Sequence, residues 1–129
     1  GSATEDEVDE AGKVIRKNCV YLHDSSYTTA SGLQVYGSPW TPEYCGWAFM
    51  LDRDVIGEKW RTIPAATDIL ITHGPPLGRG DYVVTAGNVG CSELLNEIQQ
   101  RIKPRVSIFG HVHEGYGTTF DGHTLYVNA

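Results

Sequence analysis

A strand, helix, strand succession between Asp68 and Phe109 limits most strongly what this chain can fold into. Ile69-Leu70-Ile71 is continuously apolar, which predicts a strand covered on both faces, and Val106-Ser107-Ile108-Phe109 predicts a second one. Between them, the segment Ser92–Ile102 places its apolar residues on one helical stripe, and Pro104 ends that helix. The stripe consists of Leu94, Leu95, Ile98 and Ile102. A β-α-β unit predicts a parallel pair of strands and an α/β fold.

Histidines follow both of these strands. His73 comes directly after the first strand, and His111 and His113 come after the second. A right-handed crossover brings the carboxyl ends of both strands to one edge of the sheet, so we expect His73 and His111 to meet there. On extended backbone the His111-Val112-His113 pair would point both imidazoles to one side, with α-carbons about 6.6 Å apart. Imidazole is the commonest metal ligand, so the residues predict a metal site.

Glycines beside these histidines, Gly74 and Gly110, are expected to let the backbone approach bound ions closely. A lone His-x-His pair is more often a pair of surface strand residues. The second histidine motif, at a matching strand end, shifts the balance toward metal binding.

The rest of the chain predicts smaller elements. Thr4 to Glu7 has capping-box spacing and begins a helix over about residues 5–17. Three short β-prone runs (Cys19–Leu22, Tyr27–Thr29 and Leu33–Tyr36) predict an antiparallel meander, and Thr118–Phe120 with Thr124–Val127 predicts a hairpin through Asp121-Gly122. The expected class is α/β, or α+β for a fragment, and no repeat is present.

Charge and cysteine content exclude several classes of function. The formal net charge is −6, but five acids lie in the first ten residues and the remainder holds 11 acids against 10 bases. No basic patch for a nucleic-acid backbone or a membrane surface is expected, and no apolar run approaches the ~20 residues that span a bilayer. Cys19, Cys45 and Cys91 are odd in number and widely spaced, which favours a cytoplasmic or otherwise intracellular setting. We interpret Gly1-Ser2 as residues left by cloning.

Several motifs together resemble a known family. They are Tyr36–Pro42 (YGSPWTP), Thr72–Gly78 (THGPPLG), Val89-Gly90-Cys91 before the helix, and Phe109–Gly117 (FGHVHEGYG). In this order they are similar to the calcineurin-like metallophosphoesterases, and most similar to the metallophosphoesterase domain-containing protein branch. The resemblance covers residues 18–129, which look like the carboxy-terminal half of such a domain, preceded by an acidic helix over residues 3–17.

The resemblance implies a four-layer α/β/β/α sandwich and a phosphoesterase with two divalent ions, Mn, Fe or Zn. His73 and His111 would bind one ion and His113 the other, and a metal-bound hydroxide would attack a phosphoester or nucleotide substrate. In the family, the motifs D-x-H, G-D and G-N-H-E/D precede these histidine segments, and the part of this chain before Thr72 contains none of them. We therefore expect at most one ion here and no hydrolysis by the chain alone, and Asn88 is not assigned as a ligand.

Two other classes of function compete with a phosphoesterase fragment. One is a non-catalytic interaction module that forms a homodimer through exposed sheet edges. The other is a structural metal-binding domain, for which chelation would lower thermal stability.

Some other residues near these motifs have structural interpretations. His23 and His123 are expected to be solvated turn residues. For Arg79 and Asp81 two interpretations stay open, contact with substrate or exposed loop charges. Trp40, Tyr44 and Trp47 are expected to serve loop packing rather than to form a nucleoside-stacking wall. Glu114 could act as an orienting partner for a liganding histidine.

Overall fold

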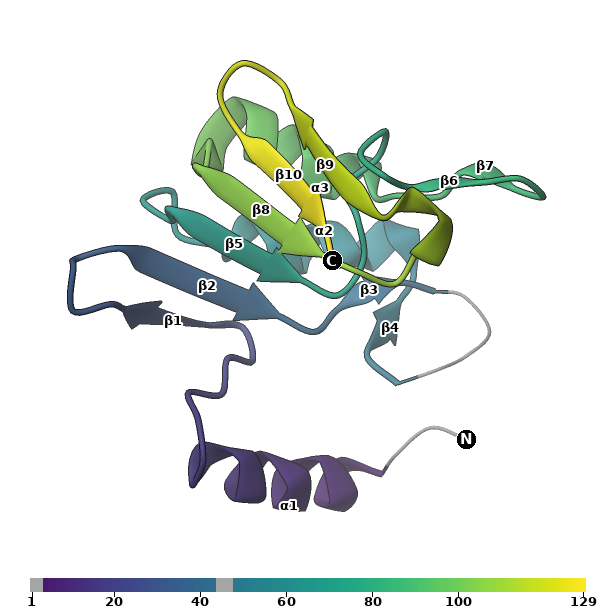
Figure 1. Ribbon diagram of the computed structural model, residues 1–129. Helices are drawn as coiled ribbons and strands as arrows, with labels where there is room; N and C mark the ends of the chain where they lie inside the picture. The colour runs from purple at the N-terminus through teal and green to yellow at the C-terminus, as the bar shows by residue number, and fades with distance from the viewer. Residues whose placement is uncertain (1–3, 44–47) are drawn as a thin grey trace.

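The computed structural model describes residues 4–43 and 48–129, and its centre is a six-stranded sheet in the order β1-β2-β5-β8-β10-β9 (Figure 1). In chain order these strands are β1 (Ser25–Thr28), β2 (Gln34–Ser38), β5 (Ile69–Thr72), β8 (Val106–Phe109), β9 (Gly117–Phe120) and β10 (Leu125–Asn128). The expected α/β class is confirmed, with a mixed sheet and few helices.

Helices and two short strand pairs complete the described chain. The helices are α1 (Glu5–Arg16), α2 (Arg53–Arg61) and α3 (Ser92–Glu97), which continues as the π-helix η1 (Ile98–Ile102), and the 3-10 turn η2 (His113–Gly115). The pairs are β3 (Thr41–Pro42) with β4 (Met50–Leu51), and β6 (Tyr82–Val83) with β7 (Gly87–Asn88).

The middle of the sheet is parallel and both of its edges are antiparallel. β2, β5, β8 and β10 run parallel, and β1 and β9 close the two sides as hairpins. The expected β-α-β unit is confirmed, since β5 and β8 pair in parallel through the register Ile71↔Ile108 with α3 between them in sequence. The carboxy-terminal hairpin is confirmed too. Its loop is held by the Asp121 carboxylate, which accepts from the backbone N–H groups of His123 and Thr124.

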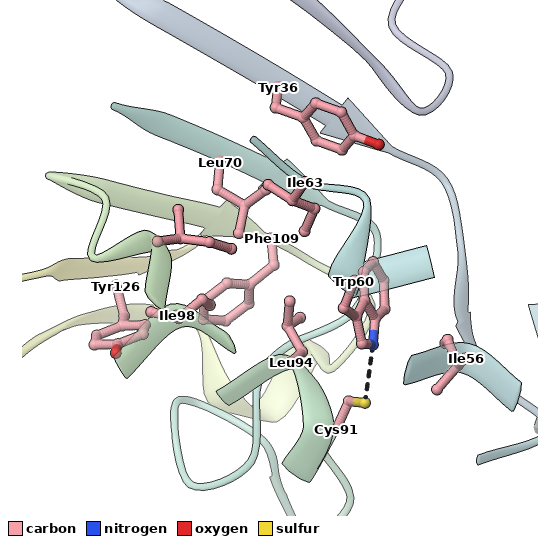
Figure 2. Packing of buried hydrophobic residues seen from close by; sticks show 11 residues of the cluster. Tyr36, Ile56, Trp60, Ile63, Leu70, Cys91, Leu94, Ile98, Phe109 and Tyr126 are labelled. Carbon is pink, nitrogen blue, oxygen red and sulfur yellow. Dashed lines mark hydrogen bonds between the residues drawn. The ribbon is translucent and has the colours of Figure 1, made fainter. Parts of the chain in front are cut away.

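The hydrophobic core lies between the sheet and the α2/α3 layer (Figure 2). Trp60 of α2 is 1% exposed, and its indole Nε1 donates to the thiol of Cys91, 3.3 Å away, at the start of α3. Each of the four parallel strands contributes one hydrophobic side chain to this core: Tyr36, Leu70, Phe109 and Tyr126. The predicted stripe on α3 is confirmed, because Leu94, Ile98 and Ile102 are buried there.

Among the described residues no second layer of helices or strands covers the opposite face of the sheet, which corrects the expectation that the strand at Ile69–Ile71 is covered on both sides. Leu70 is fully buried under the helices, whereas Ile71, its neighbour on the other face, is 39% exposed. Leu125 on β10 and Phe120 on β9 are exposed as well, at 38% and 64%. Continuous apolar sequence was therefore a correct indication of a strand but a wrong indication of two covering layers.

Two further elements differ from expectation. The Cys19–Leu22 run forms no strand, so the meander is a single β1–β2 hairpin; Leu22 instead lies against Gly37, where a Cβ would come within 2.6 Å of the Leu22 Cβ. Helix α2 was not foreseen, because only Ile56 and Trp60 mark its buried side and Gly57 interrupts the pattern.

Helix α1 begins with the expected capping box. The Glu7 backbone N–H donates to Thr4 Oγ1 at 3.2 Å, and the Thr4 backbone N–H donates to Glu7 Oε2 at 2.8 Å. The Arg16 guanidinium lies 5.0 Å from the centre of the Tyr21 ring, which follows the helix. Within the described ranges, no helix has the length and apolarity needed to cross a bilayer.

Candidate metal centre

Two of the three expected ligands converge. His73 follows β5 and His111 follows β8, and their ring nitrogens, Nε2 and Nδ1, lie 3.1 Å apart. The backbone continues the pairing of these strands past their ends, because the Gly110 N–H donates to the His73 carbonyl at 2.9 Å. The prediction that a crossover between parallel strands brings these two imidazoles together is confirmed.

The spacing of the two ring nitrogens matches adjacent ligands of one ion. With metal–nitrogen bonds of about 2.0–2.1 Å, neighbouring nitrogens of a tetrahedral site lie about 3.3 Å apart. The 3.1 Å between His73 Nε2 and His111 Nδ1 is close to that value. In the ranges that the structure describes, no group of three or more His, Cys, Asp or Glu side chains is positioned to hold a metal ion. The pair therefore fits two corners of a site and needs further ligands to complete it.

Electrostatics favour the metal-binding form of His73. Although the residue as a whole is exposed, desolvation of its ring by nearby protein atoms, and secondarily the neighbouring His111, lower the pKa of the His73 imidazole below its ordinary value. A lowered pKa keeps the ring neutral at a pH where an isolated histidine begins to carry a proton. Only the neutral imidazole can donate a lone pair to an ion, so the surroundings of His73 prepare it for coordination.

His113 is not placed as its spacing suggested. The His-x-His pair is not on extended backbone, because β8 ends at Phe109, His111 takes a left-handed conformation with φ 71°, and η2 begins at His113. The two rings therefore do not extend side by side from one strand. His113 nevertheless lines the same cavity as His73 and His111, and its role as a ligand remains a prediction.

That cavity has a volume of about 750 Å³ and is lined by residues from five separate parts of the chain. Its lining includes the three histidines and Glu114, and Arg53 of α2 supplies a cationic side chain. The remaining walls are mostly apolar or uncharged, apart from the Glu43 carboxylate: Thr41, Pro42, Pro75, Val83, Thr85, Ala86, Val89 and Val112.

Asn128 connects the two loops that carry the histidines. Its side-chain amide nitrogen donates to the carbonyl of Gly80 at 2.9 Å and to that of Val112 at 2.8 Å. The first carbonyl belongs to the loop after His73 and the second lies between His111 and His113. Close glycine packing supports this junction, because a Cβ at Gly115 would lie 1.8 Å from the Gly80 carbonyl oxygen. One buried amide thus sets the distance between the loops.

Asp81 is 1% exposed, so the interpretation as an exposed loop charge is wrong. Its carboxylate accepts from the backbone N–H groups of Gly78 and Gly90, both at 2.9 Å, and from the Asn88 side chain at 2.7 Å. Asn88 therefore has a structural partner, in keeping with its not being assigned as a ligand. These bonds tie the His73 loop to the base of the β6–β7 hairpin, which forms one wall of the cavity.

The two glycines beside the histidines differ in their surroundings, and their role in the approach of backbone to ions remains a prediction. A Cβ at Gly74 would come within 2.5 Å of the Thr41 hydroxyl, so packing of the backbone against that side chain requires glycine there. At Gly110 a Cβ would meet nothing closer than the Ala129 carbonyl, 3.7 Å away.

His23 and Trp40, which lie outside the histidine cavity, have structural roles. His23 is not a solvated turn residue, because it is partly buried and packs edge-on against Trp40 and Phe49 with ring centroids 6.1 and 5.5 Å apart. Trp40 packs on the core and donates to Asp24, which agrees with loop packing. Tyr44 and Trp47 lie outside the described residues.

The expectations for three other residues have different outcomes. His123 is exposed in its turn, as expected. Arg79 departs from the interpretation as an exposed loop charge, because it is partly buried with its guanidinium 4.6 Å from the centre of the Tyr126 ring. Glu114 is exposed at the cavity, and its role as an orienting partner remains a prediction.

Two residues of the site were missed at the level of sequence. Arg53 enters the cavity from α2, a helix that the apolar pattern did not reveal. Asn128 lies at the end of a β-prone run, where nothing local distinguishes a loop-bridging amide from an ordinary strand residue. No signal in the sequence alone would have identified Asn128.

The chain is similar in sequence to curated proteins over most of its length. Over 114 residues, 87% of the chain, it is 55% identical to the human protein named Metallophosphoesterase domain-containing protein 1. It is 44% identical over 119 residues, 92% of the chain, to UPF0046 protein T07D4.2 of Caenorhabditis elegans. The chain spans only 35% and 30% of the lengths of these relatives.

Solved structures share the fold. The crystal structure of TT1561 of Thermus thermophilus superposes with a TM-score of 0.60 at 14% identity, covering 95% of this chain and 56% of that one. No protein-family model matches the chain.

Replacing Asn128 tests the loop junction. Asn128→Asp keeps the shape of the side chain but removes both N–H donors, which leaves two carbonyls facing a carboxylate. We expect the free energy of unfolding in urea to fall by about 1–3 kcal/mol, the cost of unsatisfied buried polar groups. Asn96→Asp, the same change at an exposed position of α3, should change it by less than about 0.5 kcal/mol. Equal effects of the two substitutions would rule out the junction.

Proposed function

This chain is homologous to the carboxy-terminal part of the metallophosphoesterase domain-containing proteins, and on that basis we propose that it supplies the histidine side of a metal-dependent phosphoesterase site. The observation that carries the proposal is the convergence of His73 and His111 at the carboxyl ends of two parallel strands, 3.1 Å apart at their ring nitrogens. The substrate class we propose is a phosphoester, in keeping with the name of the relatives.

The roles of the residues follow from their places. His73 and His111 would hold one divalent ion, Mn, Fe or Zn, and His113, on the same cavity, would contribute to a second. A bound divalent ion lowers the pKa of a coordinated water and polarises a phosphoryl oxygen. The protein's own contribution is to keep His73 neutral, to hold the two histidine loops at a fixed separation through Asn128, and to enclose the substrate in the cavity.

The open face of the sheet supports a role as part of a larger unit. Ile71 and Leu125 present apolar surface on the side away from α2 and α3. The sandwich that the resemblance implies would cover this face with a second sheet, and we propose that residues beyond this chain supply that sheet together with the remaining metal ligands. The chain spans about a third of the length of the curated relatives, which leaves room for both.

Metal retention tests the ligand assignment. After dialysis against Zn²⁺ or Mn²⁺ and removal of free ion, we expect the chain to keep at most one equivalent, measured by elemental analysis. The double substitution His73→Ala and His111→Ala should abolish retention because both converging nitrogens are lost. His123→Ala is the matched control, since this exposed histidine lies in the distant β9–β10 turn. Retention that is indifferent to His73 and His111 would refute the assignment.

Hydrolysis tests the division of labour between this chain and the remainder of its parent. With Mn²⁺, the chain alone should turn over bis-p-nitrophenyl phosphate no faster than its His73→Ala, His111→Ala variant, because two histidines provide an incomplete site. The longer parent protein should hydrolyse it, and should lose activity on the same double substitution. A clear histidine-dependent turnover by the chain alone would show that the centre needs nothing further.

A second function is favoured by the exposed edges of the sheet. β1 and β9 form the two edges, and most of their residues are exposed. Unpaired edge strands with apolar neighbours are templates for pairing with another chain. The alternative is therefore an assembly module that forms a homodimer through a sheet edge, with Phe120 of β9, 64% exposed, beside the contact.

Oligomeric state tests this alternative. If the β9 edge pairs, sedimentation at about 100 µM should show a dimer, and Phe120→Lys should weaken it at least tenfold, because an edge lysine opposes strand pairing. Tyr82→Lys is the control, since Tyr82 is similarly exposed, at 57%, but lies outside the six-stranded sheet. A monomer at that concentration would eliminate the module.

A further inference from the structure

The histidine cavity contains a single strongly cationic group. Among the described residues that line it, Arg53 is the only Lys or Arg side chain, and the carboxylates of Glu43 and Glu114 lie on the same lining. An anionic ligand in this cavity is repelled by both carboxylates and attracted by Arg53. With or without a metal ion at the histidines, the guanidinium is the group among the described lining residues that attracts an anion.

Arg53 is held in place rather than free on the surface. Its Nη1 donates to the Gly90 carbonyl at 3.2 Å, and its Nη2 donates to the Val89 carbonyl at 2.9 Å. These two bonds connect the start of α2 to the chain between β7 and α3, which the Asp81 carboxylate also holds. A guanidinium has five N–H donors, so three remain beyond these two bonds. A fixed planar cation with spare donors is suited to phosphate recognition.

The Glu93 carboxylate interacts weakly with the positive charge of Arg53. The pKa of Glu93, on the first turn of α3, is lowered, chiefly because its carboxylate accepts from its own backbone N–H and in smallest part because of the Arg53 cation. Glu93 does not line the cavity, so its effect on Arg53 is a weak background charge.

The walls on either side of Arg53 are apolar. Val83, Ala86 and Val89 belong to or adjoin the β6–β7 hairpin, and Pro75 and Val112 flank the histidines. At about 750 Å³ the cavity has the size of sites that enclose an organic ligand, whereas inorganic phosphate would leave most of it filled with water. Apolar surface in such a cavity contributes to binding only when a ligand carries an apolar part to cover it.

We propose that Arg53 is the anion-binding residue of this cavity, and that its ligand is a phosphoester whose alcohol part is apolar and packs against Val83 and Val89. The inference rests on the proposed function for the reaction that the ligand undergoes, but Arg53 binds the anionic group whether or not an ion is present. Arg53 then determines affinity for the phosphate, and the hairpin selects the apolar group attached to it.

Binding of phenyl phosphate to the metal-free chain, in EDTA, tests the role of Arg53. Titration followed by NMR, with the imidazole signals of His73 and His111 as reporters, gives the dissociation constant. Arg53→Gln should raise this dissociation constant about tenfold or more. The constant for Arg53→Lys should lie between those of the wild type and Arg53→Gln. Arg61→Gln, the same change at the other end of α2 and away from the cavity lining, should leave it unchanged. Equal affinity of the wild type and Arg53→Gln overturns the proposal, as does a wild type that binds no phenyl phosphate.

A second comparison tests the apolar wall. The wild type should bind phenyl phosphate more tightly than inorganic phosphate. Val83→Thr, which keeps the volume but replaces a methyl group by a hydroxyl, should weaken phenyl phosphate binding several-fold and leave inorganic phosphate unchanged. Equal affinities of the wild type for the two ligands would overturn the assignment of an apolar alcohol group. The dispersion of amide signals in the NMR spectra shows whether each variant is folded.

Metal retention separates this inference from the proposed function. Arg53→Gln should retain Zn²⁺ as the wild type does, because Arg53 is not a ligand. If the wild type retains no ion but binds phenyl phosphate through Arg53, the phosphoesterase proposal fails and the anion site stands. If the ion is retained through His73 and His111 while Arg53→Gln binds phenyl phosphate as tightly as the wild type, the anion-site proposal fails and the metal-ligand assignment stands.

Discussion

The site depends on backbone pairing between β5 and β8, two strands that lie far apart in sequence. Their parallel register and the bond from the Gly110 N–H to the His73 carbonyl bring the ends of both strands together, and each end is followed by a histidine. A shift of one residue in this register would turn Leu70 out of the core and displace the imidazoles relative to each other. Core packing under Leu70 and Phe109 therefore also preserves the distance between His73 and His111.

Loops held by buried polar side chains complete the site that the strands begin. Asp81 fixes the turn after His73 through backbone N–H groups, and Asn128 joins this turn to the His111 loop through two carbonyls. Buried polar groups of this kind are costly when left unsatisfied, so each bond restrains the loop to one arrangement. Arg53 likewise holds the segment before α3 through the Val89 and Gly90 carbonyls, and it retains donors for a ligand.

The described part of the chain has a one-sided core. Helices cover Leu70 and Tyr126 on one face, whereas Ile71 on the other face is exposed. A sheet that buries a single face can fold, but it leaves apolar surface that another layer would cover. The chain spans 35% of the length of the human relative, and among the described residues no third His, Cys, Asp or Glu side chain joins the histidine pair in a metal-binding group. Both observations agree with a functional unit that is larger than this chain.

Local sequence was sufficient for the capping box at Thr4, the stripe on α3 and the carboxy-terminal hairpin, because capping and periodicity depend on neighbours in the chain. The meeting of His73 with His111 followed instead from the fixed handedness of β-α-β crossovers, applied to two strands distant in sequence. Tertiary structure alone decided the rest. Whether a second layer covers Ile71, which way His113 turns after β8, and which groups Arg53 and Asn128 contact all depend on segments distant in sequence. Such contacts leave no periodic trace, because a single buried hydrogen bond can be made by one residue anywhere along a strand or helix.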